Sequence, residues 1–277
     1  MKMRTNSFSS KLLRKAFTGN ISAMKNKTVL VTGTSAGIGE ALAYDLAKNK
    51  FNLVLVARRL ERLKSVQKKC LQLGAPAVEI FKLDIQDTVQ IQKFAKTNKK
   101  ILSSISVLIN NAGLAKGTDL FQNSDPADWD AMLDTNVRGL LHLTRAVMAS
   151  IIKNQGHIVN VGSVAGRLVY EGGAVYCASK FAVRAISEGL RMDLKGTSVR
   201  VTNVEPGMVQ TDFSKVRLGN QQKADAVYND MTPLKASDIS ETILWCLQRP
   251  SHVNIQELLI YPTDQASVGQ VVRRPKK

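Results

Sequence analysis

The sequence predicts a single α/β domain built on a parallel, doubly wound sheet of about seven strands, with helices on both faces. From Lys27 onward, short β-branched runs alternate with longer helix-forming segments, the order that produces repeated strand–helix–strand units. Most of these runs are continuously apolar, as expected for strands covered on both faces. No internal linker, repeat or low-complexity segment divides the 277 residues, which fits one large α/β domain.

The expected elements follow one another along residues 24–277, which we predict to form the domain. Strands are predicted over 28–31, 52–57, 77–83, 106–109, 157–162, 199–204 and 257–261. Helices are predicted over 40–49, 60–72, 89–97, 126–152, 174–194 and 236–248. In the fifth helix, Ala182, Ile186 and Leu190 recur at helical spacing and predict a buried stripe.

The formal net charge of +17 is the one unusual feature of the composition, and it raises the question of a nucleic-acid partner. Residues 1–23 hold five basic and no acidic residues, and residues 273–277 add four basic ones. The basic residues between them are scattered over predicted helices, which is typical of a solvated face. Aromatic residues make up only 5% and do not interleave with basic ones to form base-stacking platforms. The sequence therefore argues against nucleic acid as the main partner.

Residues 1–23 have the composition of an extension in front of the domain. They are rich in Ser, Lys and Arg, lack acids, and place Leu12, Leu13, Ala16 and Phe17 at helical spacing, as in a mitochondrial transit peptide. The alternatives are a poorly ordered tail or a start codon assigned too early, before Met24. We expect a cytoplasmic protein, or a protein of the mitochondrial matrix if this segment is a transit peptide.

Two other protein classes are disfavoured by pattern. No run approaches about 18 consecutive apolar residues, so no membrane-spanning helix is predicted. The three cysteines, Cys70, Cys177 and Cys246, are odd in number and widely spaced. They predict neither a disulfide framework nor a metal site, and favour a reducing compartment.

A glycine-rich turn follows the first predicted strand and leads into a helix, in the spacing G-x-x-x-G-x-G. Glycines permit a tight turn and close approach of the backbone to a phosphate, and the helix N-terminus offers free N–H groups to it. Without a ligand, such a segment is only a tight strand–helix turn. Its position favours a Rossmann-type dinucleotide site, made by Gly33, Thr34, Ser35, Ala36, Gly37, Ile38 and Gly39.

The second predicted strand ends in Arg58 and Arg59, and this position predicts the form of the dinucleotide. An acidic residue here would bind the ribose 2′-hydroxyl of NAD, whereas a guanidinium pairs with the 2′-phosphate of NADP. The alternative is that the two arginines only begin the amphipathic helix that follows. The sequence favours NADP.

Three residues near the fifth strand predict acid–base chemistry. Ser163 follows that strand, and Tyr176 and Lys180 lie four residues apart on a predicted helix, so that both side chains share one face. An adjacent ammonium favours the phenolate form of a tyrosine and brings its pKa toward a useful range. A chance pair on an exposed helix face is the alternative, which the combination with Ser163 and the glycine-rich turn disfavours.

Together these motifs resemble the short-chain dehydrogenase/reductase family over about residues 25–265. The resemblance implies a contact with adenine by Asp84 and Ile85, a central motif containing Asn111, and a fourth catalytic residue, Asn136, beside Ser163, Tyr176 and Lys180. It implies that the segment containing Pro206, Gly207, Val209 and Thr211 flanks the nicotinamide, and that Tyr176 and Lys180 also contact the cofactor. In the family, hydride transfer to a carbonyl is accompanied by proton donation from the tyrosine, the lysine holds the nicotinamide ribose, and the asparagine fixes a water. The family also forms dimers or tetramers, so we expect a homotetramer or homodimer.

Residues 199–267 resemble the NADP-dependent 3-hydroxy acid dehydrogenases of that family, which oxidise serine, L-allo-threonine and related short 3-hydroxy acids. A small acid needs an anchor for its carboxylate, and the guanidinium of Arg217 or of Arg167 could fork onto it; Arg217 as a plain surface residue is the alternative. Two other functions stay open: reduction of a lipid, steroid or quinone carbonyl, and cofactor sensing without catalysis.

Overall fold

A parallel sheet of seven strands forms the centre of the molecule, in the order β3-β2-β1-β4-β5-β6-β9. The computed structural model describes residues 27–274; the extension predicted at residues 1–23 lies outside them. The strands are β1 (Thr28–Thr32), β2 (Asn52–Ala57), β3 (Val78–Lys82), β4 (Ile105–Asn110), β5 (His157–Val161), β6 (Arg200–Pro206) and β9 (Glu257–Ile260). The predicted doubly wound parallel sheet is confirmed.

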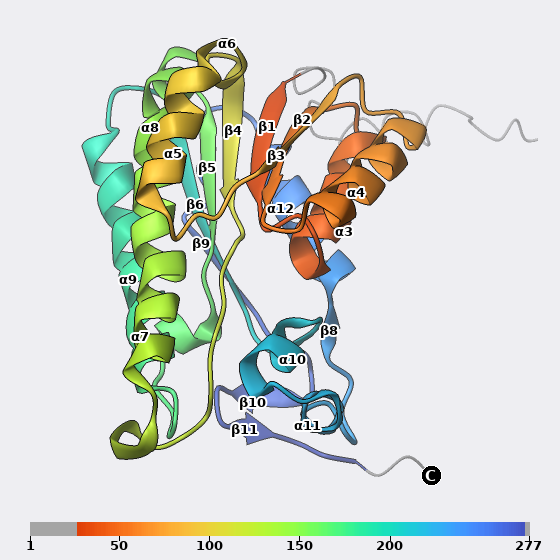
Figure 1. Ribbon diagram of the computed structural model, residues 1–277, viewed down its shortest axis with the longest axis vertical. Coiled ribbons are helices and arrows are strands. Elements are labelled where there is room, and N and C mark those ends of the chain that lie inside the picture. Colours follow the sequence, from red (N-terminus) through yellow and green to blue (C-terminus); the bar gives the residue numbers. More distant parts are fainter. Residues whose placement is uncertain (1–26, 275–277) are drawn as a thin grey trace, which may run out of the picture.

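Helices cover both faces of this sheet (Figure 1). One face carries α3 (Gly37–Lys48), α4 (Leu60–Gln72) and α12 (Ala236–Leu247). The opposite face carries α5 (Thr88–Thr97), α8 (Leu140–Lys153) and α9 (Ala174–Asp193), and a short helix, α6 (Lys99–Leu102), follows α5. Within residues 27–274, no helix combines the length and the apolar content needed to cross a bilayer.

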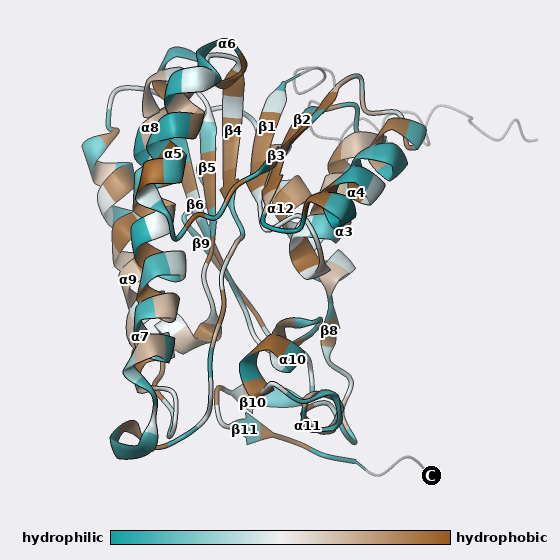
Figure 2. Cartoon of the chain, in the orientation of Figure 1, coloured by the Kyte–Doolittle hydropathy of each residue, from teal (hydrophilic) through white to brown (hydrophobic). Residues whose placement is uncertain are grey.

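The core consists of two apolar layers, one on each face of the sheet. In β1, Val29 and Val31 pack toward α3 and α12, whereas Leu30 packs toward the opposite layer, because successive side chains of a strand point to opposite faces. Figure 2 shows the central strands as the most hydrophobic part of the chain, while the helices carry hydrophilic outer faces. The continuous apolar runs in the sequence reflect this double coverage.

The segment predicted as one helix over 126–152 contains an irregular turn. It begins as α7 (Pro126–Leu133), passes through a π-helical turn at Asp134–Gly139 and continues as α8. A π turn adds a residue to the helical repeat and is often found at functional sites. Asn136 lies within this turn.

The stripe predicted on α9 is wrong in its residues. Ala182, Ile186 and Leu190 are only half-buried, and the fully buried positions are Tyr176, Cys177, Ser179, Lys180, Val183 and Ser187. The helix α9 packs against α7, the π turn, the turn after Ser163 and β6, and most of its buried residues are polar. The apolar spacing of Ala182, Ile186 and Leu190 identified a half-buried face of α9 next to the buried one.

Several short elements beyond β6 gather at the carboxyl ends of the strands (Figure 1). They are β7 (Val209–Gln210), α10 (Phe213–Leu218), α11 (Gln221–Ala226), β8 (Leu234–Lys235), β10 (Gln265–Ser267) and β11 (Gln270–Val271). The strand β7 pairs with β8, and β10 pairs with β11. None of these elements was predicted, because each is too short to carry a periodic pattern.

Candidate active site

A cavity of about 540 Å³ opens where the carboxyl ends of β1, β2, β4, β5 and β6 meet. Strand order reverses between β1 and β4, and ligands of doubly wound sheets bind in the crevice at such a switch point. The predicted site residues that line the cavity are Gly33, Ser35, Ala36, Gly37, Ile38, Arg58, Arg59, Asp84, Ile85, Asn111, Ser163, Tyr176, Lys180, Pro206, Gly207, Val209 and Thr211. Thr34, Gly39, Asn136 and Arg217 do not line it and lie behind or beside its wall.

The turn after β1 has the geometry that a phosphate requires. Gly33 and Gly37 adopt positive φ angles of 70° and 57°. A Cβ at Gly39 would lie 2.5 Å from both Asn111 Nδ2 and Gly33 O, so only glycine allows this close approach. The N-cap of α3 is Ala36, whose side chain makes no capping hydrogen bond. The first N–H groups of α3 therefore have no side-chain cap and suit an anionic ligand at the helix N-terminus.

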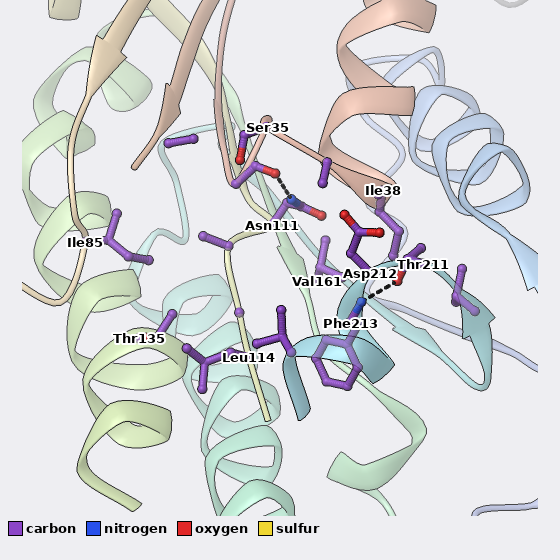
Figure 3. Close-up of a pocket in the computed structure, with 18 of the residues that line it drawn as sticks. Ser35, Ile38, Ile85, Asn111, Leu114, Thr135, Val161, Thr211, Asp212 and Phe213 are labelled. Atoms are coloured by element: carbon purple, nitrogen blue, oxygen red, sulfur yellow. Dashed lines mark hydrogen bonds between the residues drawn. The ribbon is translucent and has the colours of Figure 1, made fainter. Parts of the chain in front are cut away.

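Asn111 holds this turn against the end of β4. Its Nδ2 donates to Thr32 O at 2.8 Å, and its backbone N–H donates to Thr32 Oγ1 at 3.0 Å. Figure 3 shows Asn111 close to the turn that carries Ser35. The amide thus fixes the distance between the glycine turn and the β4 segment.

Arg58 and Arg59 place two guanidinium groups beside the turn. The Arg59 Nε donates to Ser35 Oγ at 3.1 Å and its Nη2 to Ser35 O at 3.2 Å. Arg58 Nη1 lies 3.9 Å from Asp84 Oδ2, but its side chain is 59% exposed. Arg62 also reaches Ser35 O, at 3.4 Å. Glycine backbone, a helix N-terminus and neighbouring guanidinium groups together fit a dinucleotide with an additional phosphate.

Ser163, Tyr176 and Lys180 meet on the opposite side of the cavity. Ser163 caps the short 3-10 turn Val164–Gly166 by accepting from Ala165 N–H at 3.1 Å. Burial raises the pKa of the Tyr176 phenol, while Ser163 and the charge of Arg217 act to lower it. In the ligand-free protein Tyr176 is therefore protonated at neutral pH.

Lys180 lies one helical turn from Tyr176, with its Nζ 5.9 Å from the centroid of that ring. The Nζ donates to Val161 O at 2.9 Å. Burial lowers the pKa of Lys180 to about 8, because the ammonium loses hydration and gains no carboxylate. Its proton is thus held weakly enough to be exchanged near neutral pH.

Asn136 is held in the π turn behind the cavity wall. Its Oδ1 accepts from Leu114 N–H at 2.9 Å and its Nδ2 donates to Leu114 O at 2.8 Å. The position that a Cβ at Gly113 would occupy is 3.2 Å from Asn136 Oδ1 and 3.5 Å from Lys180 Nζ. The amide and the ammonium therefore border the same small space.

The guanidinium of Arg217 lies beside the catalytic tyrosine predicted from the sequence. It stacks 5.4 Å from the Tyr170 ring centroid and 5.8 Å from that of Tyr176, and its Nε donates to Gly117 O at 3.1 Å. No ion pair within residues 27–274 includes Arg217. A cation without a carboxylate next to a reaction site is suited to an anionic ligand.

Arg167, the other suggested carboxylate anchor, is engaged elsewhere, and that suggestion is wrong. Its Nε contacts Glu205 Oε2 at 2.7 Å, and its Nη2 pairs with Glu257 Oε2. Glu205 is fully buried, so this guanidinium neutralises a charge that could not otherwise remain in the interior. Arg167 does not line the cavity.

Other residues in the cavity wall were not predicted, above all Leu114, Phe213 and Val216. Figure 3 shows Leu114 and Phe213 among the side chains lining the site, with the Phe213 N–H donating to Thr211 Oγ1 at 3.3 Å. The Phe213 ring lies 5.9 Å from the Tyr176 ring. Phe213 follows Thr211 by two residues and lies within residues 199–267, whose resemblance to the 3-hydroxy acid dehydrogenases was the signal that could have identified it. Tyr170, which supports Arg217, had no such signal.

The described residues show no cluster of metal ligands: within 27–274, no three His, Cys, Asp or Glu side chains are grouped to hold an ion. A doubly wound sheet, a glycine turn at its switch point and a Ser–Tyr–Lys set in one cavity are the architecture of a dinucleotide-dependent oxidoreductase.

Known proteins resemble the chain over nearly its whole length. Residues 27–222 match the family model described as short chain dehydrogenase. An NADP-dependent 3-hydroxy acid dehydrogenase of Schizosaccharomyces pombe is 41% identical over 257 residues, covering 92% of this chain and 99% of that protein. Sulfoacetaldehyde reductase 2 of Chromohalobacter salexigens is 42% identical over 241 residues, 86% of this chain and 95% of that protein.

A solved structure agrees with these sequence matches. The closed form of serine dehydrogenase complexed with NADP+ superposes with a TM-score of 0.82 at 39% identity, covering 89% of this chain and 99% of that one. The chain therefore belongs to the short-chain dehydrogenase/reductase family of oxidoreductases, as its motifs predicted.

Proposed function

We propose that this oxidoreductase uses NADP to interconvert short 3-hydroxy acids and the matching 3-oxo acids. The observation that carries the proposal is the guanidinium of Arg217, 5.8 Å from the Tyr176 ring. It has no carboxylate partner within residues 27–274, and a substrate carboxylate would find its counter-charge there. The names of the relatives from Schizosaccharomyces pombe and of the serine dehydrogenase support this substrate class. They give no support to a lipid, steroid or quinone substrate.

The preference for NADP over NAD would come from Arg58 and Arg59. Both line the cavity beside Ser35, where the guanidinium groups would pair with the 2′-phosphate and the turn from Gly33 to Gly39 would hold the pyrophosphate. When bound, NADPH supplies the hydride for reduction of the carbonyl.

The residues around the carbonyl would orient it and supply the proton. Ser163 and Tyr176 would donate hydrogen bonds to the carbonyl oxygen, and Tyr176, protonated at neutral pH, would transfer its phenolic proton to the developing alkoxide. Lys180 would favour the resulting phenolate by its charge. Asn136, which borders the space next to Lys180, would stabilise the Lys180 ammonium during this proton transfer. In oxidation of the hydroxy acid the same groups would act in reverse.

The test is an Arg217→Met variant assayed with NADP over serine, L-allo-threonine, 3-hydroxypropionate and a neutral secondary alcohol. Loss of a charge-assisted contact predicts a rise in KM of at least about tenfold for the acids, with little change for the alcohol. Arg249→Met is the matched control, since Arg249 also stacks on an aromatic ring, Trp245, at 4.5 Å, but does not line the cavity. Equal effects of Arg217→Met on acids and alcohol would remove the carboxylate assignment.

We also propose a homotetramer, with a homodimer as the simpler alternative. Exposed apolar side chains occur on the helices α7, α8 and α9, namely Leu133, Leu141 and Phe181, and on α12 and β9, namely Trp245 and Leu259. Burial of such groups between copies would remove them from water. Light scattering coupled to gel filtration would decide, and a monomer at micromolar concentration would contradict the proposal.

For the compartment we propose the cytoplasm, with the mitochondrial matrix as the alternative if residues 1–23 direct import. The three cysteines are buried and free, which suits a reducing environment. Cell fractionation of the full chain and of a chain starting at Met24 would distinguish the two compartments.

A further inference from the structure

We propose that Ser179 is a positioning residue, which fixes the amide of Asn136 and ties it to the turn of α9 that carries Tyr176. This inference rests on the proposed function, because it concerns the proton relay beside Tyr176. It arises from two hydrogen bonds made by one fully buried hydroxyl.

The hydroxyl of Ser179 joins two elements of the site. It donates to Tyr176 O at 2.7 Å, within the helix α9. It also accepts from Asn136 Nδ2 at 3.0 Å, across to the π turn. Asn136 is thereby linked directly to the helical turn from which the Tyr176 side chain projects.

The donors and acceptors of the Asn136 amide show how the hydrogen bond to Ser179 affects this side chain. The two N–H bonds of Asn136 are both used, one by Leu114 O and one by Ser179 Oγ. Its Oδ1 has two lone pairs, and one accepts from Leu114 N–H. The second lone pair of Oδ1 remains able to accept a hydrogen bond from a group in the space next to Gly113, which Lys180 Nζ also borders.

Without the Ser179 hydroxyl, one buried N–H of Asn136 would lose its partner. A buried donor without an acceptor is costly, so the amide would rotate or shift to find another one. Oδ1 would then move within the space that it borders together with Lys180 Nζ, next to Gly113. An acceptor beside an ammonium favours the charged form, so its loss leaves Lys180 less able to stabilise the phenolate of Tyr176.

The expected consequence is a shift in the pH dependence of alcohol oxidation, which requires the phenolate. The titratable or charged groups facing Tyr176 are Lys180 and Cys177 on the same helix, Tyr170 before it, and Arg217 on α10. Ser179→Ala alters none of these groups directly. A shift would therefore report on the Asn136 amide.

The experiment compares Ser179→Ala with Ser187→Ala, a matched control on the same helix. Ser187 is also buried, donates to Val183 O at 2.7 Å and accepts from Asn160 Nδ2 at 2.8 Å, but Asn160 does not line the cavity. Ser179→Thr retains a hydroxyl and serves as the rescue variant. Two quantities are measured: the pH profile of kcat for oxidation with NADP, and the hydrogen-exchange rate of the Leu114 amide.

For Ser179→Ala we expect the rising limb of the profile to move to higher pH by about one unit, with kcat at pH 7 reduced about tenfold. We expect the Leu114 amide, which donates to Asn136, to exchange about tenfold faster. Ser187→Ala should change neither quantity, and Ser179→Thr should restore both. An unshifted profile together with unchanged Leu114 exchange would overturn the assignment. If the wild-type chain shows no NADP-linked activity, the proposed function fails, while Leu114 exchange still decides whether Ser179 positions Asn136.

Discussion

Replacing Lys180 by Met should stabilise the ligand-free protein relative to wild type at neutral pH. At alkaline pH this advantage of the variant should be lost. The ammonium of Lys180 is buried against Tyr176, and its one hydrogen-bond partner in the described chain is Val161 O. No carboxylate compensates the lost hydration. Methionine has nearly the same volume and carries no charge, so it relieves this cost.

The magnitude follows from the difference between the folded and unfolded pKa values. Burial lowers the pKa of Lys180 from 10.5 to about 8, which corresponds to about 3 kcal/mol of differential stability. Because the unfolded chain holds this proton more tightly, the wild-type free energy of unfolding rises as pH increases from about 8 to 10.5. The destabilisation of wild type by the buried ammonium is present in full below the pKa of Lys180 in the folded state. It disappears above the pKa of this lysine in the unfolded state. The lost hydrogen bond to Val161 O subtracts about 1 kcal/mol from the variant and depends little on pH.

The assay is urea unfolding followed by circular dichroism at pH 7, 8, 9 and 10. The stability of Lys180→Met minus that of wild type should fall by about 2 to 3 kcal/mol between pH 7 and pH 10. Lys68→Met, which removes an exposed lysine from α4, is the control. A difference between Lys180→Met and wild type that stays constant over this range would refute the claim that Lys180 is buried as a destabilised cation.

Two further predictions concern other guanidinium groups. Arg59→Met should weaken NADPH binding about tenfold and leave NADH binding nearly unchanged, because only NADPH carries a 2′-phosphate. Fluorescence titration with both cofactors measures the two affinities, and equal weakening of both would contradict the prediction. Arg167→Met should lower the free energy of unfolding by about 3 kcal/mol, since it leaves the buried Glu205 without its counter-charge. Adding Glu205→Gln should restore part of this loss in urea unfolding, and a further loss would show that the charge of Glu205 is not the cause.

The sheet could be predicted from sequence because its signal is local. Most strands are runs of apolar residues, because burial on both faces favours apolar residues along the whole run. Residues 52–57 match β2 at both ends. The short elements after β6 could not be predicted. The strands β7 and β8 depend on a pairing between distant residues, such as Val209 with Leu234. The strands β10 and β11 are neighbours in the sequence but are only three and two residues long, too short to carry a strand pattern.

The candidate site shows the same division. The glycine turn and the Tyr176–Lys180 pair are local patterns, and the structure brings them to one cavity. Asn136 in the π turn bonds to Leu114, twenty-two residues earlier, and no local pattern around Asn136 predicts such a turn. Arg167 follows Ser163 so closely that a role at the site was plausible, but its partners Glu205 and Glu257 lie 38 and 90 residues away.

Part of the positive charge that gives the chain its net charge of +17 lies at the candidate site. Arg58 and Arg59 follow β2, and Arg217 lies on α10 beside Tyr176, so the cationic groups are divided between two parts of the cavity region. An anionic cofactor and an anionic substrate bound together repel each other, and separate counter-charges offset that repulsion for each ligand. Since the side chain of Arg58 is largely exposed, salt should weaken the cofactor contact more than the contact at the half-buried Arg217.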